Sequence, residues 1–319
     1  MINGGGFVGI LTYNRAESLS VQQIHTFCRV YELGGYAGAS EQLGLAGPTM
    51  WEQVKALERI YQTGLFQRSG RNIRPTPAGD VLYRLLTPLL ATVESTFEIL
   101  AEQADQGSLQ IRLVTGVRMM LEELGQPLRD FKRSYPDLTL KFMTADNRVA
   151  QELLLEDKAD LALLIEPPKD IVAHGIVWEK LYRIGYLAAF PPKHRLSKNE
   201  NFTLQALVNE PLVVGNPNTV GRRMLEQALF RLGINSPLRI AAETDNSAIT
   251  LACVRAGIGI GIIAGRPDGN LTRDIKTRSL TNELGQVHVV AAYRKGRQLT
   301  NALKTLLDRL RIQSTRSEA

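Results

Sequence analysis

The chain has 319 residues, of which 44% are hydrophobic and 22% are charged, and its formal net charge is +6. This composition excludes a collagenous or largely disordered chain, and the length suits about two or three domains. No apolar run reaches the ~20 residues of a membrane span, and the only cysteines, Cys28 and Cys253, lie far apart in the sequence. We therefore expect a cytoplasmic protein with no membrane segment, no disulfide framework and no metal cluster.

The positive charge is not concentrated in one segment. Residues 19–80 carry six Lys or Arg against five Asp or Glu, whereas residues 108–319 carry thirty against twenty-two. Net charge is therefore no argument for DNA binding, and any such evidence has to come from motifs. Residues 1–18 begin with a glycine-rich stretch and lack the pattern of a signal peptide, so we interpret them as a disordered extension.

Three short helices are predicted after this extension, at residues 21–33, 36–43 and 47–58. The second and third are separated by a tight turn at residues 44–46. A stripe of apolar residues at 3–4 spacing marks the first helix: Ile24, Phe27, Cys28 and Tyr31. Helix, helix, tight turn and helix is the plan of a helix-turn-helix domain.

The third helix has two unlike faces. At 100° per residue, Met50, Val54 and Leu57 lie on one side, and polar residues lie on the other. Gly47 is predicted to cap this helix, with Pro48 at its first position. A small helix with an apolar back and a polar front is what the major groove of DNA admits. The residues predicted to face DNA are Gly47, Pro48, Thr49, Trp51, Glu52 and Lys55.

A basic turn follows the third helix. Arg68, Arg71 and Arg74 surround a glycine, which suits a two-stranded wing that lies on a phosphate backbone. Thr76 is then predicted to cap a long helix at residues 77–106.

An apolar seam along this long helix predicts pairing with the same helix of a second copy, with an intrachain helical hairpin as the alternative. The predicted seam consists of Leu82, Leu86, Leu89, Val93 and Leu100. An acidic row on the same helix is predicted to be a solvated face: Glu94, Glu98 and Glu102.

Residues 107–311 alternate between strand and helix patterns. Strands are predicted near residues 109–114, 138–143, 160–166, 183–190, 238–243, 259–263 and 287–293. Helices are predicted near residues 121–134, 148–156, 219–232, 247–255 and 299–311. This alternation predicts an α/β region with parallel sheets in two subdomains, in which ligands bind beyond the carboxyl ends of strands.

These motifs resemble those of LysR-type transcriptional regulators, from residue 19 to about residue 311. The most specific are Phe27, GGYAGASEQL at residues 34–43, AGPTMWEQVKALE at 46–58, LFQRSGR at 65–71 and TPAG at 76–79. The C-terminal half adds FKRSYP at residues 131–136, DLAL at 160–163 and AGIGI at 256–260.

The resemblance implies an all-α winged helix-turn-helix domain at residues 19–76, a dimerisation helix at 77–106 and an effector-binding domain at 107–311. That α/β domain would resemble type 2 periplasmic binding proteins, with subdomain I at residues 107–182 and 270–311, subdomain II at 183–269, and a tail at 312–319. The implied partners are double-stranded DNA, a small-molecule effector, further copies of the chain as a homodimer or homotetramer, and RNA polymerase.

Four stretches are expected to line a cleft between these subdomains. Thr115, Gly116 and Arg118 would bind a carboxylate, phosphate or sulfate; the alternative is an exposed arginine beside an ordinary helix cap. Glu166 is expected at a hinge or pocket rim. The other candidates, for some of which plain helix capping is the alternative, are Asn216, Asn218, Thr219, Asp245 and Ala264.

Two outward positions of the third helix depart from the family pattern. The family has Ser-Arg where this chain has Trp51-Glu52. Glu52 lacks the guanine-reading group of arginine but accepts a hydrogen bond from cytosine N4, and Trp51 offers an apolar contact to a thymine methyl. We therefore expect an altered operator. The alternative is a sensing module with altered or lost DNA recognition that acts through protein partners.

Catalytic patterns are missing from the sequence. The four histidines are scattered, and neither a Gly-x-Ser-x-Gly motif nor a P-loop is present. The glycine-rich stretch at residues 257–261 follows a predicted helix, so it indicates a helix end and a buried strand rather than a dinucleotide site. We expect neither an enzyme nor a bound cofactor.

Overall fold

The computed structural model describes residues 17–70, 72–104, 110–199, 202–234 and 237–318, with side chains described to residue 311. The chain forms two compact units. The first comprises Met1–Leu100 together with Lys295–Gln298, and the second comprises Ala101–Arg294 together with Leu299–Ala319. Each unit has its own hydrophobic core.

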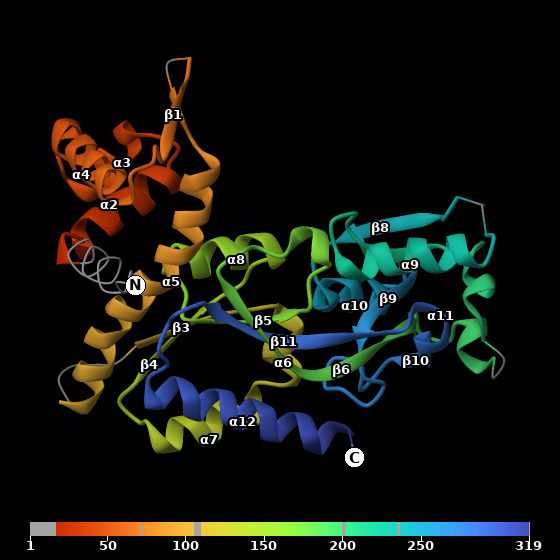
Figure 1. The fold of residues 1–319 in the computed structure, drawn as a ribbon. Coiled ribbons are helices and arrows are strands. Elements are labelled where there is room, and N and C mark those ends of the chain that lie inside the picture. The colour runs from red at the N-terminus through yellow and green to blue at the C-terminus, as the bar shows by residue number, and fades with distance from the viewer. Residues whose placement is uncertain (1–16, 71, 105–109, 200–201, 235–236, 319) are drawn as a thin grey trace, which may run out of the picture. The chain divides into compact units, whose positions relative to one another are not determined.

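The first unit contains three short helices, a hairpin and a long helix (Figure 1). These are α2 (Val21–Glu32), α3 (Tyr36–Leu43), α4 (Gly47–Tyr61), β1 (Phe66–Ser69), β2 (Asn72–Pro75) and α5 (Pro77–Gln103). Ser20 caps α2 in a reciprocal pair with Gln23, and Thr76 accepts from the Gly79 N–H at the start of α5. Strong local caps thus set where these helices begin.

The start of α4 differs by one residue from the prediction. Ala46, with extended backbone at φ −65° and ψ 139°, is the cap residue, so Gly47 is the first helical residue and Pro48 the second. Pro48 is tolerated there because the first N–H groups of a helix have no partner within it. The prediction that Gly47 caps α4 is therefore wrong.

The predicted seam of α5 is wrong for two of its residues. Leu82 and Leu86 are buried, and they pack with Phe27 and Leu57 in the core of their own unit. The exposed apolar residues of α5 form a different row, which consists of Val81, Leu85, Leu89, Phe97 and Leu100. Which side of α5 stays exposed depends on how α5 packs on α2 and α4. The 3–4 spacing alone did not reveal that side.

The acidic row of α5 is not simply a solvated face. Glu98 forms an ion pair with Arg297, and in the second unit Glu102 accepts from the backbone N–H groups of Asn301 and Ala302 at 2.7 and 2.8 Å. The residues that these carboxylates bind lie about two hundred positions further along the chain. Partners so far apart in the sequence produce no pattern that can be recognised in the local sequence around α5.

The second unit is built on one nine-stranded sheet, counted over the described residues, with strand order β4-β3-β5-β11-β6-β9-β7-β8 and β10 paired to β6. Its strands are β3 (Gln110–Thr115), β4 (Thr139–Met143), β5 (Leu161–Ile165), β6 (Ile176–Phe190), β7 (Leu212–Gly215), β8 (Ile240–Thr244), β9 (Ile260–Gly265), β10 (Lys276–Ser279) and β11 (Gln286–Arg294). Its α-helices are α6 (Val117–Glu122), α7 (Gly125–Ser134), α8 (Asn147–Leu155), α9 (Val220–Arg231), α10 (Ser247–Arg255), α11 (Thr281–Leu284) and α12 (Asn301–Glu318). Three short 3-10 helices complete it: η1 (Lys169–Ile171), η2 (Arg195–Lys198) and η3 (Leu204–Leu207).

The expectation of parallel sheets is wrong. β3 pairs in parallel with β4 and β5, but β11 pairs antiparallel with β5 and β6, and β6 pairs antiparallel with β9. The strand β6 begins at Ile176, seven residues before its predicted start. The first part of this strand was not predicted because polar side chains interrupt its apolar pattern. The short strands β7 and β10 were not predicted, and the predicted helix at residues 121–134 is the pair α6 and α7.

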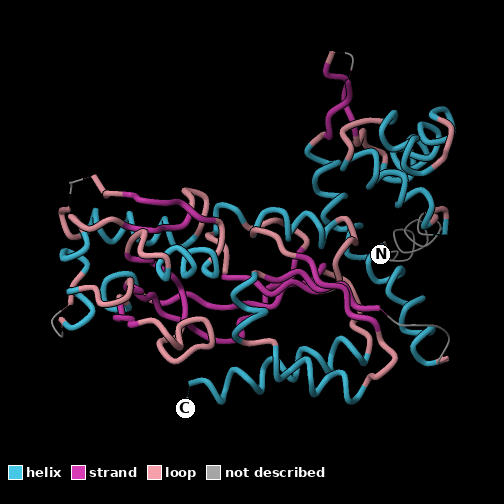
Figure 2. Tube along the Cα trace, turned by 180° about the vertical axis from the view of Figure 1, so that it is seen from behind, coloured by secondary structure: helices cyan, strands magenta, loops and turns pink. Residues whose placement is uncertain are grey.

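Helices cover both faces of the sheet (Figure 2). Alternate residues of β5 face opposite sides: Leu163 packs in the cluster that contains α7 and α12, and Leu164 packs with α8. A strand buried on both faces has to be apolar throughout. This explains the continuous Leu-Ala-Leu-Leu-Ile run of β5.

Candidate nucleic-acid interface and effector site

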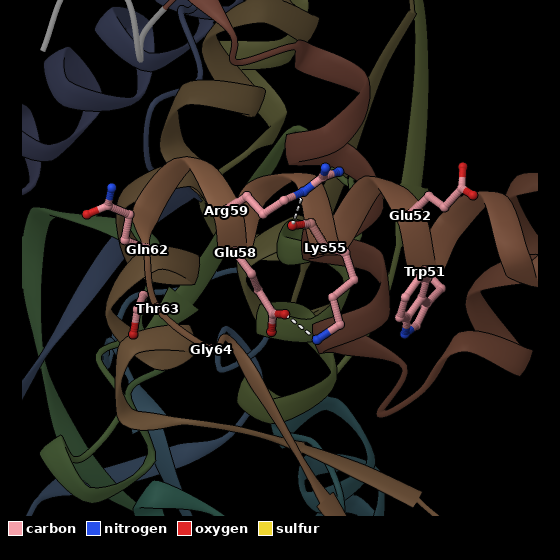
Figure 3. Close-up of a pocket in the computed structure, with 8 residues that line it drawn as sticks. All are labelled: Trp51, Glu52, Lys55, Glu58, Arg59, Gln62, Thr63 and Gly64. Carbon is pink, nitrogen blue, oxygen red and sulfur yellow. Dashed lines mark hydrogen bonds and ion pairs between the residues drawn. The ribbon is translucent and has the colours of Figure 1, made fainter. Parts of the chain in front are cut away.

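The apolar side of α4 is buried in the core of the first unit. Met50, Val54 and Leu57 are each at most 1% exposed. Trp51 and Glu52 are exposed on the outer surface, where they border a shallow depression of about 840 Å³ (Figure 3). The other residues that line it are Lys55, Glu58, Arg59, Gln62, Thr63 and Gly64.

Three side chains along this surface are in contact. Lys55 Nζ lies 5.8 Å from the centre of the Trp51 ring and 2.5 Å from Glu58 Oε2 (Figure 3). The other carboxylate oxygen of Glu58 accepts from the backbone N–H of Leu65 at 2.8 Å. Burial alone would raise the pKa of Glu58, but these hydrogen bonds outweigh it and lower that pKa. One carboxylate therefore joins the last turns of α4 to the segment that leads into the hairpin.

Glu58 was not among the predicted site residues. Its partner N–H groups belong to a segment that shows no recognisable hydrogen-bonding motif, so this contact had little signal in the sequence. Its position, four residues after Val54, only indicated that Glu58 lies near the buried side of α4.

The wing is the hairpin of β1 and β2, in which Arg68 pairs with Ile73 and Arg74 with Gln67. Arg68 and Arg74 are exposed, and Arg71 lies outside the described residues. At the start of α4, Pro48 and Thr49 are exposed and Gly47 is half-buried. The first unit thus presents a helix front and a basic hairpin on its surface.

In the second unit, Arg118 is buried rather than exposed. Its guanidinium pairs with Glu123, and both side chains are 8% exposed. Within the described chain, Arg118 Nη2, Glu123 Oε2 and the Tyr186 hydroxyl have no hydrogen-bond partner. Burial raises the pKa of Glu123 even though Arg118 acts in the opposite direction. Arg118 and Glu123 thus form a buried ion pair in which, among the described residues, one guanidinium nitrogen and one carboxylate oxygen have no partner.

Thr115 and Gly116 precede this pair. Thr115 ends β3 and is 1% exposed, and Gly116 is the cap residue of α6. Among the described residues, the buried threonine hydroxyl makes one long contact, of 3.5 Å, to the Gly116 carbonyl. Its hydrogen-bonding capacity is therefore largely unused.

Glu166, immediately after β5, belongs to a charged network on β6 and β11. It lies 3.1 Å from Lys180 Nζ and 2.9 Å from His288 Nδ1, and the other ring nitrogen of His288 accepts from Arg183. A bulge between Val289 and Val290 interrupts the pairing of β11 with β6 beside this network. These contacts place Glu166 in a charged network between β5, β6 and β11.

The candidates on α9 and α10 make local capping contacts. Thr219 accepts from the Arg222 N–H as cap of α9, and its hydroxyl donates to the Asn216 carbonyl. The Asn216 side chain accepts from the Asn218 N–H. Asp245 is not the cap of α10, because Asn246 holds that position and Asp245 accepts from its side chain.

Tyr186 brings several of these stretches together. It pairs with Ala264 across β6 and β9, and a Cβ on Gly221, in the first turn of α9, would lie 3.4 Å from its ring. Burial raises the pKa of Tyr186, and the positive charge of Arg118 opposes that shift. Sequence reasoning missed Tyr186 because it sits within an apolar strand.

Two family models match the chain. The model described as "Bacterial regulatory helix-turn-helix protein, lysR family" matches residues 21–80, and "LysR substrate binding domain" matches residues 104–314. The chain belongs to the LysR family. It is a transcriptional regulator with a helix-turn-helix DNA-binding domain and an effector-binding domain, so the predicted fold class and function are confirmed.

Relatives with established names support the family assignment. The regulator CfxR of Cupriavidus necator is 27% identical over 250 residues, which cover 78% of this chain and 76% of the relative. The activator CmpR of Synechocystis is 26% identical over 308 residues, which cover 92% and 95% of the two chains. The crystal structure of HinK, a LysR regulator of Pseudomonas aeruginosa, aligns with a TM-score of 0.54 at 25% identity, covering 92% and 98% of the chains.

These LysR relatives are named as regulators or activators of transcription. Among the described residues, no helix is both long and apolar enough to cross a membrane.

Proposed function

We propose that the front of α4 enters the major groove of double-stranded DNA and that the wing lies on the phosphate backbone. The observation that carries this proposal is the division of α4: its apolar side is fully used in the core, and its Trp51–Glu52 side is left exposed. The proposed groove residues are Gly47, Pro48, Thr49, Trp51, Glu52 and Lys55. The proposed phosphate contacts are Arg68, Arg71 and Arg74.

Selection from a random DNA pool tests this proposal. We expect the protein to enrich a defined motif whose affinity falls steeply with salt, because phosphate contacts release counterions. A Trp51→Ser, Glu52→Arg variant serves as the matched control and should enrich a different motif. Identical motifs for the two proteins would contradict the assigned reading residues. A lack of salt-dependent binding would favour a sensing module that acts through protein partners.

We infer that α5 mediates a homodimer. Val81, Leu85, Leu89 and Leu100 follow one another at four-residue steps and one eleven-residue step, which keeps them on one side of the helix. Within the described part of α5 all four are exposed, Leu85 at 66%. A row of exposed apolar side chains is more stable when a second apolar surface covers it than when it faces water.

Leu85→Asp is expected to weaken the homodimer, because it places a charge in this apolar row. Light scattering after size-exclusion chromatography measures the mass of the assembly. The control is Val21→Asp, which changes an exposed residue of α2 outside the row. An unchanged mass for Leu85→Asp would contradict the role of α5.

The effector-binding domains are proposed to pair further into a homotetramer. Both edges of the sheet carry exposed apolar residues, Phe142 on β4 and Ile240 on β8, and Phe230 is exposed at the end of α9. Paired edges would bury these residues and protect the open strands.

We propose that a small anionic effector binds beyond the strand ends of the second unit and that the protein acts in the cytoplasm. The residues proposed to respond to it are Thr115, Gly116, Arg118, Glu166, Asn216, Asn218, Thr219, Asp245 and Ala264. In the described part of the chain, Arg118 Nη2 and the Tyr186 hydroxyl have no hydrogen-bond partner and the Thr115 hydroxyl makes one long contact, which supports this position. Binding would shift the equilibrium of two effector-domain states by ~1–3 kcal/mol and alter DNA bending and RNA polymerase recruitment.

A thermal-shift screen of small anionic and aromatic metabolites tests this site. We expect a stabilising compound whose effect falls in Asn218→Ala, an exposed position before α9, and persists in Asn72→Ala in the other unit. A compound that stabilises all three proteins equally would place the effector elsewhere. DNA footprints with and without that compound should differ in extent.

A further inference from the structure

On the exposed face of α4, the side chain of Lys55 is engaged in contacts within the protein. The ammonium group of Lys55 lies beside the carboxylate of Glu58, at 2.5 Å from Oε2, and 5.8 Å from the centre of the Trp51 ring (Figure 3). Because Glu58 is itself held by the Leu65 N–H, moving Lys55 toward a base would leave that carboxylate without its cation. Besides Pro48 and Thr49, the exposed groups at the front of the helix are the ring of Trp51 and the carboxylate of Glu52.

Glu52 is exposed, and the structure shows no hydrogen bond or ion pair for its carboxylate within the described residues. An ionised carboxylate accepts hydrogen bonds and cannot donate them. In the major groove, guanine presents N7 and O6 and thymine presents O4, all of which are acceptors that would repel it. Cytosine presents the N4 amino donor and adenine the N6 amino donor, but in adenine the acceptor N7 lies beside the donor, so Glu52 matches cytosine better.

Trp51 is 51% exposed and precedes Glu52 by one residue. The two side chains therefore diverge by about 100° around the helix and face different bases. The stick view shows them at the start of α4, pointing in different directions (Figure 3). Among the four bases, thymine alone presents a methyl group in the major groove, and an apolar ring gains by covering it.

We propose that this face reads a cytosine amino group with Glu52 and, at a neighbouring position, a thymine 5-methyl group with Trp51. Within the proposed groove face, Lys55 then acts as a positioning residue rather than a base contact, because it pairs with Glu58 and lies beside the Trp51 ring. The inference rests on the proposed placement of α4 in the major groove and adds the two chemical groups that it selects.

The test uses the full-length protein and the DNA motif enriched by it. Each thymine of the motif is replaced by uracil, which removes only the 5-methyl group. We expect one thymine per half-site whose replacement weakens binding about fourfold, the value of one buried methyl group. In Trp51→Ala the affinities for the thymine and uracil forms should agree within about twofold. This ratio cancels any general loss of affinity in the variant.

The second measurement addresses Glu52. At one position next to that thymine, replacement of cytosine by each other base should weaken binding roughly five- to a hundredfold. Glu52→Ala should flatten this preference, and Glu52→Gln should retain part of it, because the amide oxygen still accepts from cytosine N4.

The outcomes separate this inference from the proposal beneath it. Salt-dependent, sequence-specific binding that is indifferent to every thymine-to-uracil change overturns the role of Trp51. A preferred A·T or T·A base pair at the position that responds to Glu52→Ala overturns the role of Glu52. Failure to bind any DNA motif contradicts the placement of α4 in the groove instead.

Discussion

Arg118→Ala is expected to lower the free energy of unfolding of the second unit by about 3–5 kcal/mol, because it leaves Glu123 buried without its cation. Both side chains are 8% exposed, and Glu123 Oε2 already has no partner among the described residues. In a unit of this size, a loss of that order lowers the melting temperature by about 10 °C. Thermal unfolding monitored by circular dichroism measures it.

Two matched variants separate the buried pair from charge in general. Arg148→Ala removes an arginine whose pair with Glu152 is largely exposed, and it should cost no more than about 0.5 kcal/mol. The double variant Arg118→Met, Glu123→Leu should recover most of the loss, because an apolar pair of similar volume leaves no charge to desolvate. A melting temperature of Arg118→Ala within about 2 °C of the parent would refute this account.

The same result bears on the effector site. Loss of ligand binding in Arg118→Ala would not identify a ligand contact, because the variant is expected to disturb the fold around Tyr186 and Glu123. Asn218→Ala avoids this problem, since Asn218 is exposed and it is its backbone N–H that donates to the Asn216 side chain.

Gly296→Ala is expected to cost about 2–4 kcal/mol in the first unit, combining backbone strain with a steric clash. Gly296 has φ +87°, and a Cβ there would lie 2.0 Å from the carbonyl oxygen of Pro88 in α5. The glycine carbonyl accepts from Thr92, and the Gln298 N–H donates to Ser95. The added methyl group has to displace the 295–298 segment from α5.

Gly257→Ala is the control, because Gly257 has a similar φ of +77° but nothing within 4 Å of the added Cβ. It should show the conformational cost of about 1 kcal/mol without the clash. Hydrogen exchange reports the location: amides of α5 near Pro88–Glu98 should lose protection in Gly296→Ala only. Equal exchange in the two variants would show that Gly296 does not anchor the segment to α5.

The sequence by itself determined the features that depend on neighbours within a few residues. The Thr76 cap of α5, the two faces of α4 and the apolar run of β5 each produce a local pattern. These patterns recur in the order of a LysR regulator, and both family models match over the same regions. Short-range rules of capping and periodicity were therefore enough for the class of the protein.

Only the tertiary structure decided which residues are paired, buried or free. Glu98 meets Arg297 across about two hundred residues, and Leu82 turns toward the core while Leu85 does not. The burial of Arg118 and the antiparallel course of β6 likewise depend on contacts with distant segments. Such pairings are selected by packing of the whole unit, and no local propensity encodes them. On α4, the contacts of Lys55 with Trp51 and Glu58 leave Glu52 as the exposed carboxylate of the reading face.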